Sequence, residues 1–501
     1  MNKNNILKCL LASALTMGAA TSCDQLDSEV FDSYNTSVFP KTEKDVNSLL
    51  VGGVYAPFRN NMFEGLFSCN NRGVQIYNDM CTDLGDCEWE DVYWYDLINV
   101  NFNTNQVEGP PLIYRNNING VTRMTNIIRT IERMDAISEE NKGKLIAQAR
   151  CGRGWLVYIL YDMFGGIQFI TDEALANPAQ NIITPRSSAE ETSRFAEEDL
   201  LYAATHLPAT IPHGSGDYGR FTAGAAYTVL MHLYMYDKRW ADAARIGREL
   251  MKPEYGYDLI PEFKDVFTLQ NEGNKETIWA CVEDQGIQTQ LWLSAVLSPI
   301  CPTTNPNIVK WSGYRLPWQF VHSFEPGDKR MDVILTSVTS SAGITYSESN
   351  PRKYMDKGAY PVKYGEDPED TGSGSAIDWI VLRYADVLTL QAEALAREAG
   401  LVTAEAVELL NRVRNRAGLC SYSTSDFGSL EAFLDAVLEE RGHELWFEGW
   451  RRSDLVRHDK FVAYAKLYKK SRTAAPHHVL FPIPQEIINE GRGLVVQNPG
   501  Y

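Results

Sequence analysis

Residues 221–250 read FTAGAAYTVLMHLYMYDKRWADAARIGREL, and this stretch decides the fold. Apolar and small residues recur in it at the three- and four-residue spacing of a helix that buries one face. The pattern breaks near Asp237-Lys238. The stretch therefore predicts two helices joined by a short turn.

The two predicted helices match the spacing of a tetratricopeptide repeat, in which large and small residues alternate at fixed offsets. The large, leucine, tyrosine, second aromatic and small positions are filled by Tyr227, Leu230, Tyr234, Trp240 and Ala243. Ala394 and Ala406 stand at the two small positions of a second, partial match. Small side chains there let paired helices approach closely, so we expect tetratricopeptide-like packing.

Helical periodicity continues on both sides of this stretch. Residues 145–164 end at Gly165-Gly166, a pair that stops helices, and residues 188–207 end before Pro208. Further helices are expected at 114–134, 379–397, 404–417 and 430–447. The fold class is therefore mainly α, with the tetratricopeptide-like helices mainly within 114–250 and 379–450.

Two long regions lack helical periodicity. Residues 60–110 are rich in Asn, Asp, Gly and aromatic residues, and residues 253–378 are rich in Gly, Pro, Ser and Asn. Short strand-like runs such as 277–282 occur in the second region. Long ordered loops in compact proteins are often functional, so both regions are candidates for binding.

The first residues read as an export signal. Lys3 and Lys8 supply a short positive region, residues 6–20 are mostly apolar but too short a run to span a membrane, and small residues lead to Cys23. We expect residues 1–22 to be a lipoprotein signal peptide, Cys23 to carry the lipid, and 23–42 to form an acidic tether. A cysteine carrying several acyl chains would hold the protein on a membrane permanently.

Composition and charge narrow the range of partners that the protein can bind. The chain has 501 residues, 44% of them hydrophobic, and a net charge of -18. This charge argues against nucleic acid as a partner and against direct docking on anionic lipid. Beyond the signal, no stretch predicts a membrane span.

Seven cysteines remain after Cys9 and Cys23 are set aside, and an odd number cannot all pair. A disulfide among Cys69, Cys81 and Cys87 and a set of buried free thiols both stay open. The cysteines lack zinc-site spacing, and no contiguous calcium motif accompanies the Asp- and Asn-rich loops. No cofactor or metal is therefore expected, although the loops could hold a structural calcium.

Several short strings occur along the chain in a fixed order. They are Gln148-Ala149-Arg150, Phe164-Gly165-Gly166, Arg186-Ser187-Ser188, Gly219-Arg220-Phe221-Thr222, Leu382-Arg383-Tyr384-Ala385-Asp386, Asn411-Arg412-Val413-Arg414, Phe447-Glu448-Gly449, Phe481-Pro482-Ile483-Pro484 and Gln497-Asn498-Pro499-Gly500-Tyr501. In this order, on a chain with a lipoprotein signal, they resemble the SusD/RagB family over nearly the whole mature length.

The resemblance implies one SusD-like domain over 43–501, anchored to the extracellular face of an outer membrane. It implies a lid on a SusC-like TonB-dependent transporter, which captures glycan and delivers it to that transporter without catalysis. Some members of the family capture peptides, so a peptide cargo stays open, and the particular glycan is not specified by the sequence.

Charged residues within the helical motifs are expected to be structural. A lone buried charge is very costly, so charges on apolar helices should pair with one another. The residues concerned are Arg383, Asp386, Glu393, Arg414, Arg441, Glu444, Glu448 and Asp454. We expect an ion-pair network that locks helices together, with no catalytic residue among them.

A glycan site needs exposed aromatic rings for the C–H faces of sugars, beside polar groups for the hydroxyls. Trp155, Trp240, Trp379, Trp446 and Trp450 lie in helical stripes and Trp279 in a strand-like run, so these are expected in the core. The two irregular regions supply the predicted ligand-binding residues, Asp83, Trp89, Trp94, Trp292, Trp311 and Trp318. The alternative is that several of them pack beneath the loops as small satellite cores.

Two other classes of protein remain to be weighed. A secreted glycoside hydrolase needs two carboxyl groups about 5 Å or about 6.5–9.5 Å apart, and no motif among the 65 acidic residues marks such a pair. A plain tetratricopeptide scaffold would bind protein only.

Overall fold

The computed structural model describes residues 39–501 except 61–64, 70–72, 178–179, 181 and 373. The expected signal peptide, the lipidated Cys23 and most of the tether lie outside the described residues. In the part of the chain that the structure describes, no helix combines the length and apolarity needed to cross a membrane.

Helices dominate the molecule, as the sequence predicts. The long ones are α2 (Glu43–Leu50), α5 (Pro110–Glu132), α6 (Glu139–Phe164), α8 (Ala189–His206), α9 (Ala223–Tyr236), α10 (Trp240–Leu250), α13 (Tyr384–Ala399), α14 (Ala404–Arg416), α15 (Leu430–Leu445) and α17 (Phe461–Tyr468). The short ones are α3 (Val74–Met80), α4 (Val92–Ile98), α7 (Asp172–Ala176), α11 (Trp292–Val296), α12 (Trp318–Val321), α16 (Arg451–Arg457) and α18 (Gln485–Glu490).

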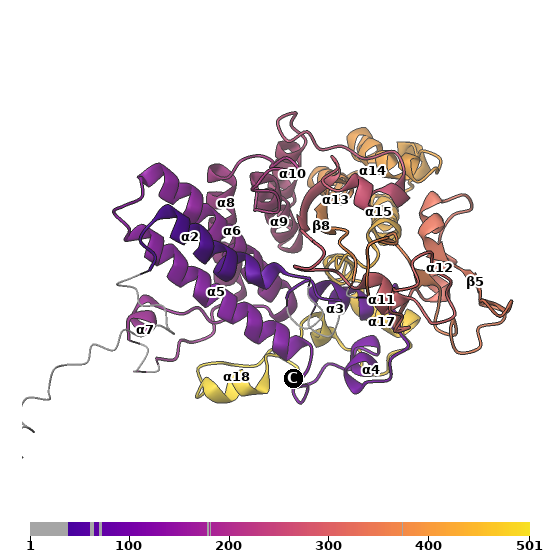
Figure 1. Ribbon diagram of the computed structural model, residues 1–501, viewed down its shortest axis with the longest axis horizontal. Helices are drawn as coiled ribbons and strands as arrows, with labels where there is room; N and C mark the ends of the chain where they lie inside the picture. Colours follow the sequence, from indigo (N-terminus) through magenta and orange to yellow (C-terminus); the bar gives the residue numbers. More distant parts are fainter. Residues whose placement is uncertain (1–38, 61–64, 70–72, 178–179, 181, 373) are drawn as a thin grey trace, which may run out of the picture.

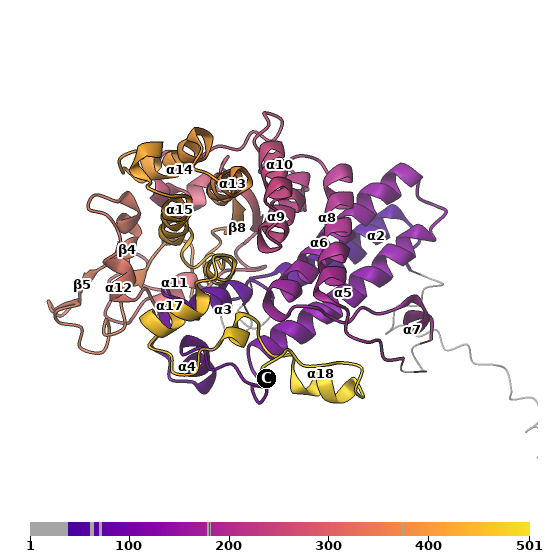
Figure 2. The ribbon, with the colours of Figure 1, turned by 180° about the vertical axis from the view of Figure 1, so that it is seen from behind.

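The long helices form a continuous array (Figures 1 and 2). Helix α5 packs on α6, α6 on α8, α8 on α9, α9 on α10, α10 on α13, and α13 on both α14 and α15. At the predicted small positions, Ala243, Ala394 and Ala406 are fully buried. Gly247 on α10 allows a close approach to α13, because a Cβ there would lie 1.8 Å from Gln391 Oε1.

The helix ends follow local chemistry. Thr222 begins α9 by accepting a hydrogen bond from the Ala225 amide at 3.0 Å. Ser188 and Glu191 form a reciprocal capping box at the start of α8. Helix α13 ends at Gly400, whose φ of 68° is readily adopted only by glycine.

Within the described residues, four two-stranded antiparallel sheets complete the fold. They pair β1 (Asp86–Cys87) with β3 (Tyr314–Arg315), β2 (Thr277–Cys281) with β8 (Trp379–Arg383), β4 (Ile334–Leu335) with β7 (Tyr360–Pro361), and β5 (Ser337–Thr339) with β6 (Thr345–Ser347). A mainly α fold with a few short strands is confirmed.

Two local predictions need correction. The segment predicted as a helix from residue 379 begins as strand β8, and helix α13 starts only at Tyr384. Every residue of β8 is buried, so its unbroken apolar run could not be told from a buried helix by periodicity. The region 60–110 is also not entirely loop, since it holds α3 and α4.

A buried network of opposite charges lies where β8, α13, α14 and α15 meet. Arg383, fully buried at the end of β8, donates to Glu276 at 2.8 Å and to Glu448 at 2.7 Å, and also pairs with Glu444. Through shared partners the network joins five cations, Arg330, Lys363, Arg383, Arg414 and Arg416, to five buried carboxylates, Glu276, Asp328, Glu440, Glu444 and Glu448. Burial opposes the ionisation of Glu444, but the surrounding guanidinium groups outweigh it and hold its pKa below the usual range.

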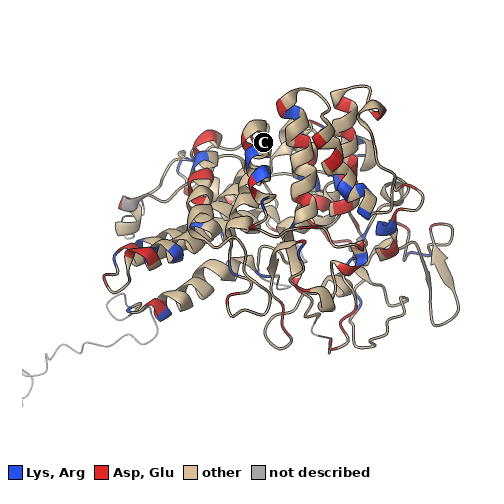
Figure 3. Cartoon of the chain, turned by 90° about the horizontal axis from the view of Figure 1, so that it is seen from above, with Lys and Arg blue, Asp and Glu red and all other residues tan. Residues whose placement is uncertain are grey.

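A second network joins the helical array to the C-terminal helices. Arg441 on α15 bonds Asp386 on α13 and Asp454 on α16, each at 2.8 Å. Arg457 bonds Glu393 at 2.8 Å, and His232 on α9 lies 2.6 Å from Asp386. The prediction of a structural ion-pair network is confirmed. Figure 3 shows acidic and basic residues interspersed along the same helices.

The cysteines of the described chain form no disulfide. Cys69, Cys81 and Cys87 are free thiols, and all three are buried. Burial raises the pKa of each thiol to about 12. The sequence leaves a disulfide and buried free thiols both open, and the structure shows free thiols.

Breaking the buried network should destabilise the protein strongly. We expect Glu444→Gln to lower the free energy of unfolding by about 3–5 kcal/mol, because Arg383 and Arg416 would lose a charged partner in the core. Urea unfolding followed by circular dichroism measures this.

The matched control is Glu140→Gln, which breaks the exposed Lys144–Glu140 pair at 2.8 Å. Exposed pairs contribute at most about 1 kcal/mol. Equal effects of the two substitutions would show that the buried network is not what stabilises this region.

Candidate functional site

The pairing of β1 with β3 brings the two irregular regions together. Asp86 lies opposite Arg315, and Cys87 lies opposite Tyr314. Beside this pairing, the Trp89 indole N–H donates to the Trp311 carbonyl at 3.0 Å. Both side chains are partly exposed. Two tryptophans that are distant in sequence are therefore neighbours at the surface.

Gly313 is what allows this approach. The Glu88 amide donates to the Gly313 carbonyl at 2.9 Å, which places the Trp89 ring directly against Gly313. A Cβ at Gly313 would lie 2.5 Å from the Trp89 ring and 2.7 Å from the Ala295 carbonyl. No side chain fits in that space without displacing a neighbour.

Buried aromatic rings support the exposed ones. Trp89 and Tyr93 both pack on Trp94, with ring centroids 5.9 and 5.1 Å apart. Trp94 contacts Tyr314 at 5.5 Å, and Tyr314 contacts Trp292 at 5.9 Å. We call Trp89, Tyr93 and Trp311 the aromatic platform. The Trp89 and Tyr93 rings rest on this packed base, so they would need little ordering on binding a ligand.

Arg315 fixes the turn that carries Trp311. Its guanidinium is fully buried and donates to the Val296 carbonyl at 2.9 Å and to the Ser312 hydroxyl at 2.8 Å. Ser312 has a φ of 56°, an uncommon conformation for a non-glycine residue. The hydrogen bond from Arg315 holds the turn in that conformation.

The six predicted ligand residues separate into three groups. Trp89 and Trp311 share the platform, as described above. Trp94 and Trp292 are 0% and 1% exposed, and Asp83 is 5% exposed and paired with Arg451 at 2.7 Å, so these three cannot touch a ligand in this conformation. Trp94 and Trp292 support the surface from beneath as part of the main hydrophobic core, not as separate satellite cores.

Trp318 is partly exposed but belongs to a different neighbourhood. It begins α12, its indole donates to the Met355 carbonyl at 2.8 Å, and its ring faces His322. Within the described residues, no ring contact joins it to the platform.

Sequence reasoning placed Tyr93 in an aromatic segment suited to carbohydrate but not among the predicted ligand residues, and it did not single out Gly313 or Arg315. Tyr93 stands within the aromatic run before Asn99, which is a usable signal. Gly313 and Arg315 carry no signal of their own, because their role depends on which distant segment packs against them.

The platform offers polar groups beside its rings. Glu88 lies 3.8 Å from the Arg315 guanidinium. Burial raises the pKa of Glu88 despite that cation. Its side chain is 16% exposed, so the carboxyl remains at the edge of the surface next to Trp89.

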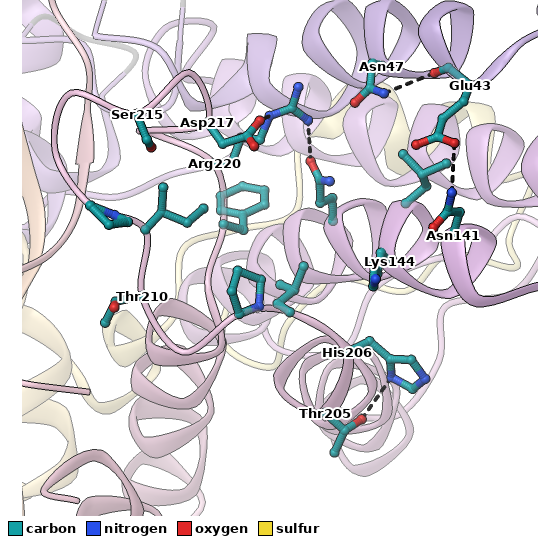
Figure 4. A pocket seen from close by; sticks show the side chains of 17 residues that line it. Glu43, Asn47, Asn141, Lys144, Thr205, His206, Thr210, Ser215, Asp217 and Arg220 are labelled. Atoms are coloured by element: carbon teal, nitrogen blue, oxygen red, sulfur yellow. Dashed lines mark hydrogen bonds and ion pairs between the residues drawn. The ribbon is translucent and has the colours of Figure 1, made fainter. Parts of the chain in front are cut away.

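Grooves open elsewhere, on the helical array. One of about 820 Å³ lies between α2, α6, the end of α8 and the loop 207–221 (Figure 4). A second, of about 340 Å³, lies between Tyr55, Arg59 and strand β2, and Arg220 lines both. None of the six predicted ligand residues lines either groove.

Two carboxyl groups with raised pKa lie near the second groove. The Asp378 amide donates to Glu272 at 3.0 Å, and Asp378 accepts from the Tyr218 hydroxyl at 2.9 Å. Burial, and then the Asp378 carboxylate, raise the pKa of Glu272 to about 7. Burial also raises the pKa of Asp378. Among the described residues, no group of three or more side chains is arranged to hold a metal ion.

Gly313→Ala should displace Trp89. The added methyl overlaps the indole and the Ala295 carbonyl, so we expect a loss of about 1–3 kcal/mol in unfolding free energy. Tryptophan fluorescence should also change as Trp89 leaves its packed position. An alanine variant with unchanged stability and emission would contradict the packing described here.

Glu272→Gln should change how stability depends on pH. Folded Glu272 holds its proton up to about pH 7, whereas the unfolded carboxyl releases it near pH 4.5. The wild type therefore loses stability as pH rises from about 4.5 to about 7. The glutamine keeps the acceptor for the Asp378 amide without ionising.

Denaturant unfolding at pH 5 and pH 8 measures this effect. We expect the variant to gain on the wild type at pH 8, whereas the exposed Glu408→Gln control should not. The same difference between variant and wild type at both pH values would show that the pKa of Glu272 is not raised.

Comparison with known proteins supports a family assignment. A model described as the SusD family matches residues 328–501, and one described as starch-binding, associating with outer membrane, matches residues 32–235. SusD-like protein P38 of Formosa agariphila is 39% identical over 356 residues, covering 63% of this chain and 67% of that protein. SusD-like protein P2 of the same organism is 27% identical over 387 residues, covering 72% and 75%.

Solved structures share the fold. Surface glycan-binding protein A of Bacteroides thetaiotaomicron, in complex with laminarihexaose, aligns with a TM-score of 0.73 and 21% identity, covering 91% of this chain and 99% of that one. The corresponding protein of Bacteroides fluxus aligns with a TM-score of 0.76 and 21% identity, covering 92% and 100%. From its family matches and its relatives, this chain belongs to the SusD family.

Proposed function

We propose that the protein binds glycan on its aromatic platform and delivers it to a SusC-like transporter. The observation that carries this proposal is the rigid pairing of partly exposed Trp89 and Trp311 across two distant segments. Relatives named for binding starch, laminarin or laminarihexaose support glycan as the ligand class.

The chemistry of the platform fits a sugar chain. An indole face covers the C–H patch of a pyranose, and the exposed polar groups of the surrounding loops can bond its hydroxyls. Each aromatic contact adds about 0.5–1.5 kcal/mol beyond the burial of area. Two or three such contacts give weak binding with fast release, which suits a protein that passes its ligand on.

The location follows from the expected lipid anchor. A lipid on Cys23 would hold the domain at the outer membrane through the tether, with the platform free to face the medium or the transporter. The family description that mentions the outer membrane supports this placement. A peptide cargo for the platform has no comparable support, because no observation at Trp89 or Trp311 favours an amide backbone.

We propose binding without hydrolysis. The raised pKa values of Glu272 and Asp378 are the feature that a hydrolase would use for its acid. Each oxygen of Asp378 has a structural hydrogen-bond partner, the Glu283 amide for one and the Tyr218 hydroxyl for the other. Neither carboxyl belongs to the platform.

Affinity electrophoresis against laminarin, starch and other neutral polysaccharides tests the site. For the polysaccharide that retards the wild type, we expect Trp89→Ala and Trp311→Ala each to weaken binding about tenfold, or roughly 1.4 kcal/mol. Each truncation removes a stacking face, and Trp89→Ala also removes the hydrogen bond to the Trp311 carbonyl.

The matched control is Trp240→Ala, which removes a partly buried indole on α10 of the helical array and should leave retardation unchanged. Incubation of the bound polysaccharide with the wild type should release no reducing ends. Retention of binding in both platform variants, or release of reducing ends that Glu272→Gln abolishes, would overturn this proposal.

A further inference from the structure

The groove of about 820 Å³ on the helical array has its own binding chemistry, separate from the platform. Its floor is one face of α6, where Asn141, Leu145 and Gln148 follow one another, and one wall is α2 with Asn47. Figure 4 shows Asn47, Glu43 and Asn141 on one side, and Thr210, Ser215 and Asp217 across from them. From these residues we propose that the groove binds an extended, uncharged segment of polypeptide.

Three side-chain amides have fixed orientations, because each bonds a partner that can only donate or only accept a hydrogen bond. Gln148 turns its oxygen to the Arg220 guanidinium at 2.9 Å and to the Tyr55 hydroxyl at 3.0 Å, and arginine cannot accept. Its Nε2 group is therefore left over. In the described part of the chain, that group donates to nothing.

Asn141 and Asn47 are fixed in the opposite sense. Asn141 donates to the Glu43 carboxylate at 2.9 Å, and Asn47 donates to the Glu43 carbonyl at 3.0 Å. Both partners only accept, so both asparagine oxygens are left as acceptors. The groove thus offers two oxygens that can accept from a peptide N–H, and one NH2 group that can donate two hydrogen bonds to peptide carbonyls.

The spacing fits an extended chain. Asn141 and Gln148 are seven residues apart on one helix face, which is about 10 Å along the axis. That distance spans about three residues of extended backbone. Leu207, Pro208, Ile211 and Pro212 line the groove as well and provide apolar contacts for side chains. Arrays of helical hairpins present concave surfaces of this kind for binding extended partners.

The charges and rings of the groove argue for an uncharged peptide over an anion or a glycan. Arg220 is paired with Asp217 at 2.8 Å and Lys144 with Glu140 at 2.8 Å, so neither cation is free for an anion. The seventeen described residues that line the groove include no Trp or Tyr, and Phe221 is only 1% exposed. The His206 ring, which also lines the groove, stacks on Tyr202 with ring centroids 4.0 Å apart, so the groove offers no tryptophan or tyrosine face on which a sugar could stack.

Saturation-transfer NMR on the full mature chain tests the proposal. The probes are the capped peptide acetyl-Ser-Val-Gln-Thr-Pro-Ser-amide, the same peptide carrying two lysines or two glutamates, and laminarihexaose. We expect the uncharged peptide to be saturated several-fold more than either charged one. Trp89→Ala should not change this, since the platform is a separate surface.

Two groove variants and one control sharpen the result. Gln148→Glu keeps the oxygen that faces Arg220 and replaces only the outward N–H group, so it should fold normally and reduce saturation of the uncharged peptide at least threefold. Ser215→Trp should fill the exposed groove and abolish saturation. Gln485→Glu adds the same charge on exposed α18 and should have no effect.

Unchanged saturation of the peptide in both groove variants would overturn the proposal, as would an absence of saturation in the wild type. Loss of laminarihexaose saturation in the groove variants, but not in Trp89→Ala, would assign the groove to glycan instead. Failure of the platform prediction alone would leave the groove result standing, because the probes and variants differ.

The peptide could come from a partner's loop or from the medium. Ser215→Cys in a Cys420→Ser background can be labelled with a maleimide, on the purified chain and on membranes from cells that make it. Reduced labelling on membranes would assign the occupant to a membrane partner. Equal labelling would assign it to free peptide.

Discussion

The rest of the structure depends on the buried guanidinium of Arg383. It lies at the junction of β8 and α13 and bonds carboxylates from before β2, from α15 and from the turn after α15. None of these groups can be buried alone at an acceptable free energy, so all must arrive together. The charge network therefore specifies how the array, the central strands and the C-terminal helices meet.

This constraint reaches the surface through aromatic contacts. Strand β8 carries Arg383 at one end and Trp379 at the other, and Trp379 packs on Trp292 at 5.8 Å. Trp292 contacts Tyr314, and Tyr314 contacts Trp89 with ring centroids 5.1 Å apart. The partly exposed Trp89 ring is thus the last of a series of packed rings that begins next to the buried ion pairs. Position at the surface is set by chemistry in the core.

How well each part of the structure could be predicted depends on whether the interactions that determine it are local in the sequence. Helical periodicity located the array because amphipathic spacing is local, and the buried ion pairs were foreseeable because charges on apolar helices need partners. Strand β8 was misassigned because a fully buried strand has no period. In the candidate site, Trp89 and Trp311 are partly exposed as predicted from their loops, whereas Trp94 and Trp292 are buried. Which tryptophan of a loop reaches the surface depends on the distant residue that packs against it, as the position of Trp89 depends on Gly313.

The hydrogen bond from Trp89 to Trp311 joins residues 222 positions apart. A contact of that span closes a very long loop, and such contacts form late in folding because chain entropy opposes them. A growing chain holds Trp89 long before Trp311 has been added. The aromatic platform can therefore form only on chains that extend past Trp311.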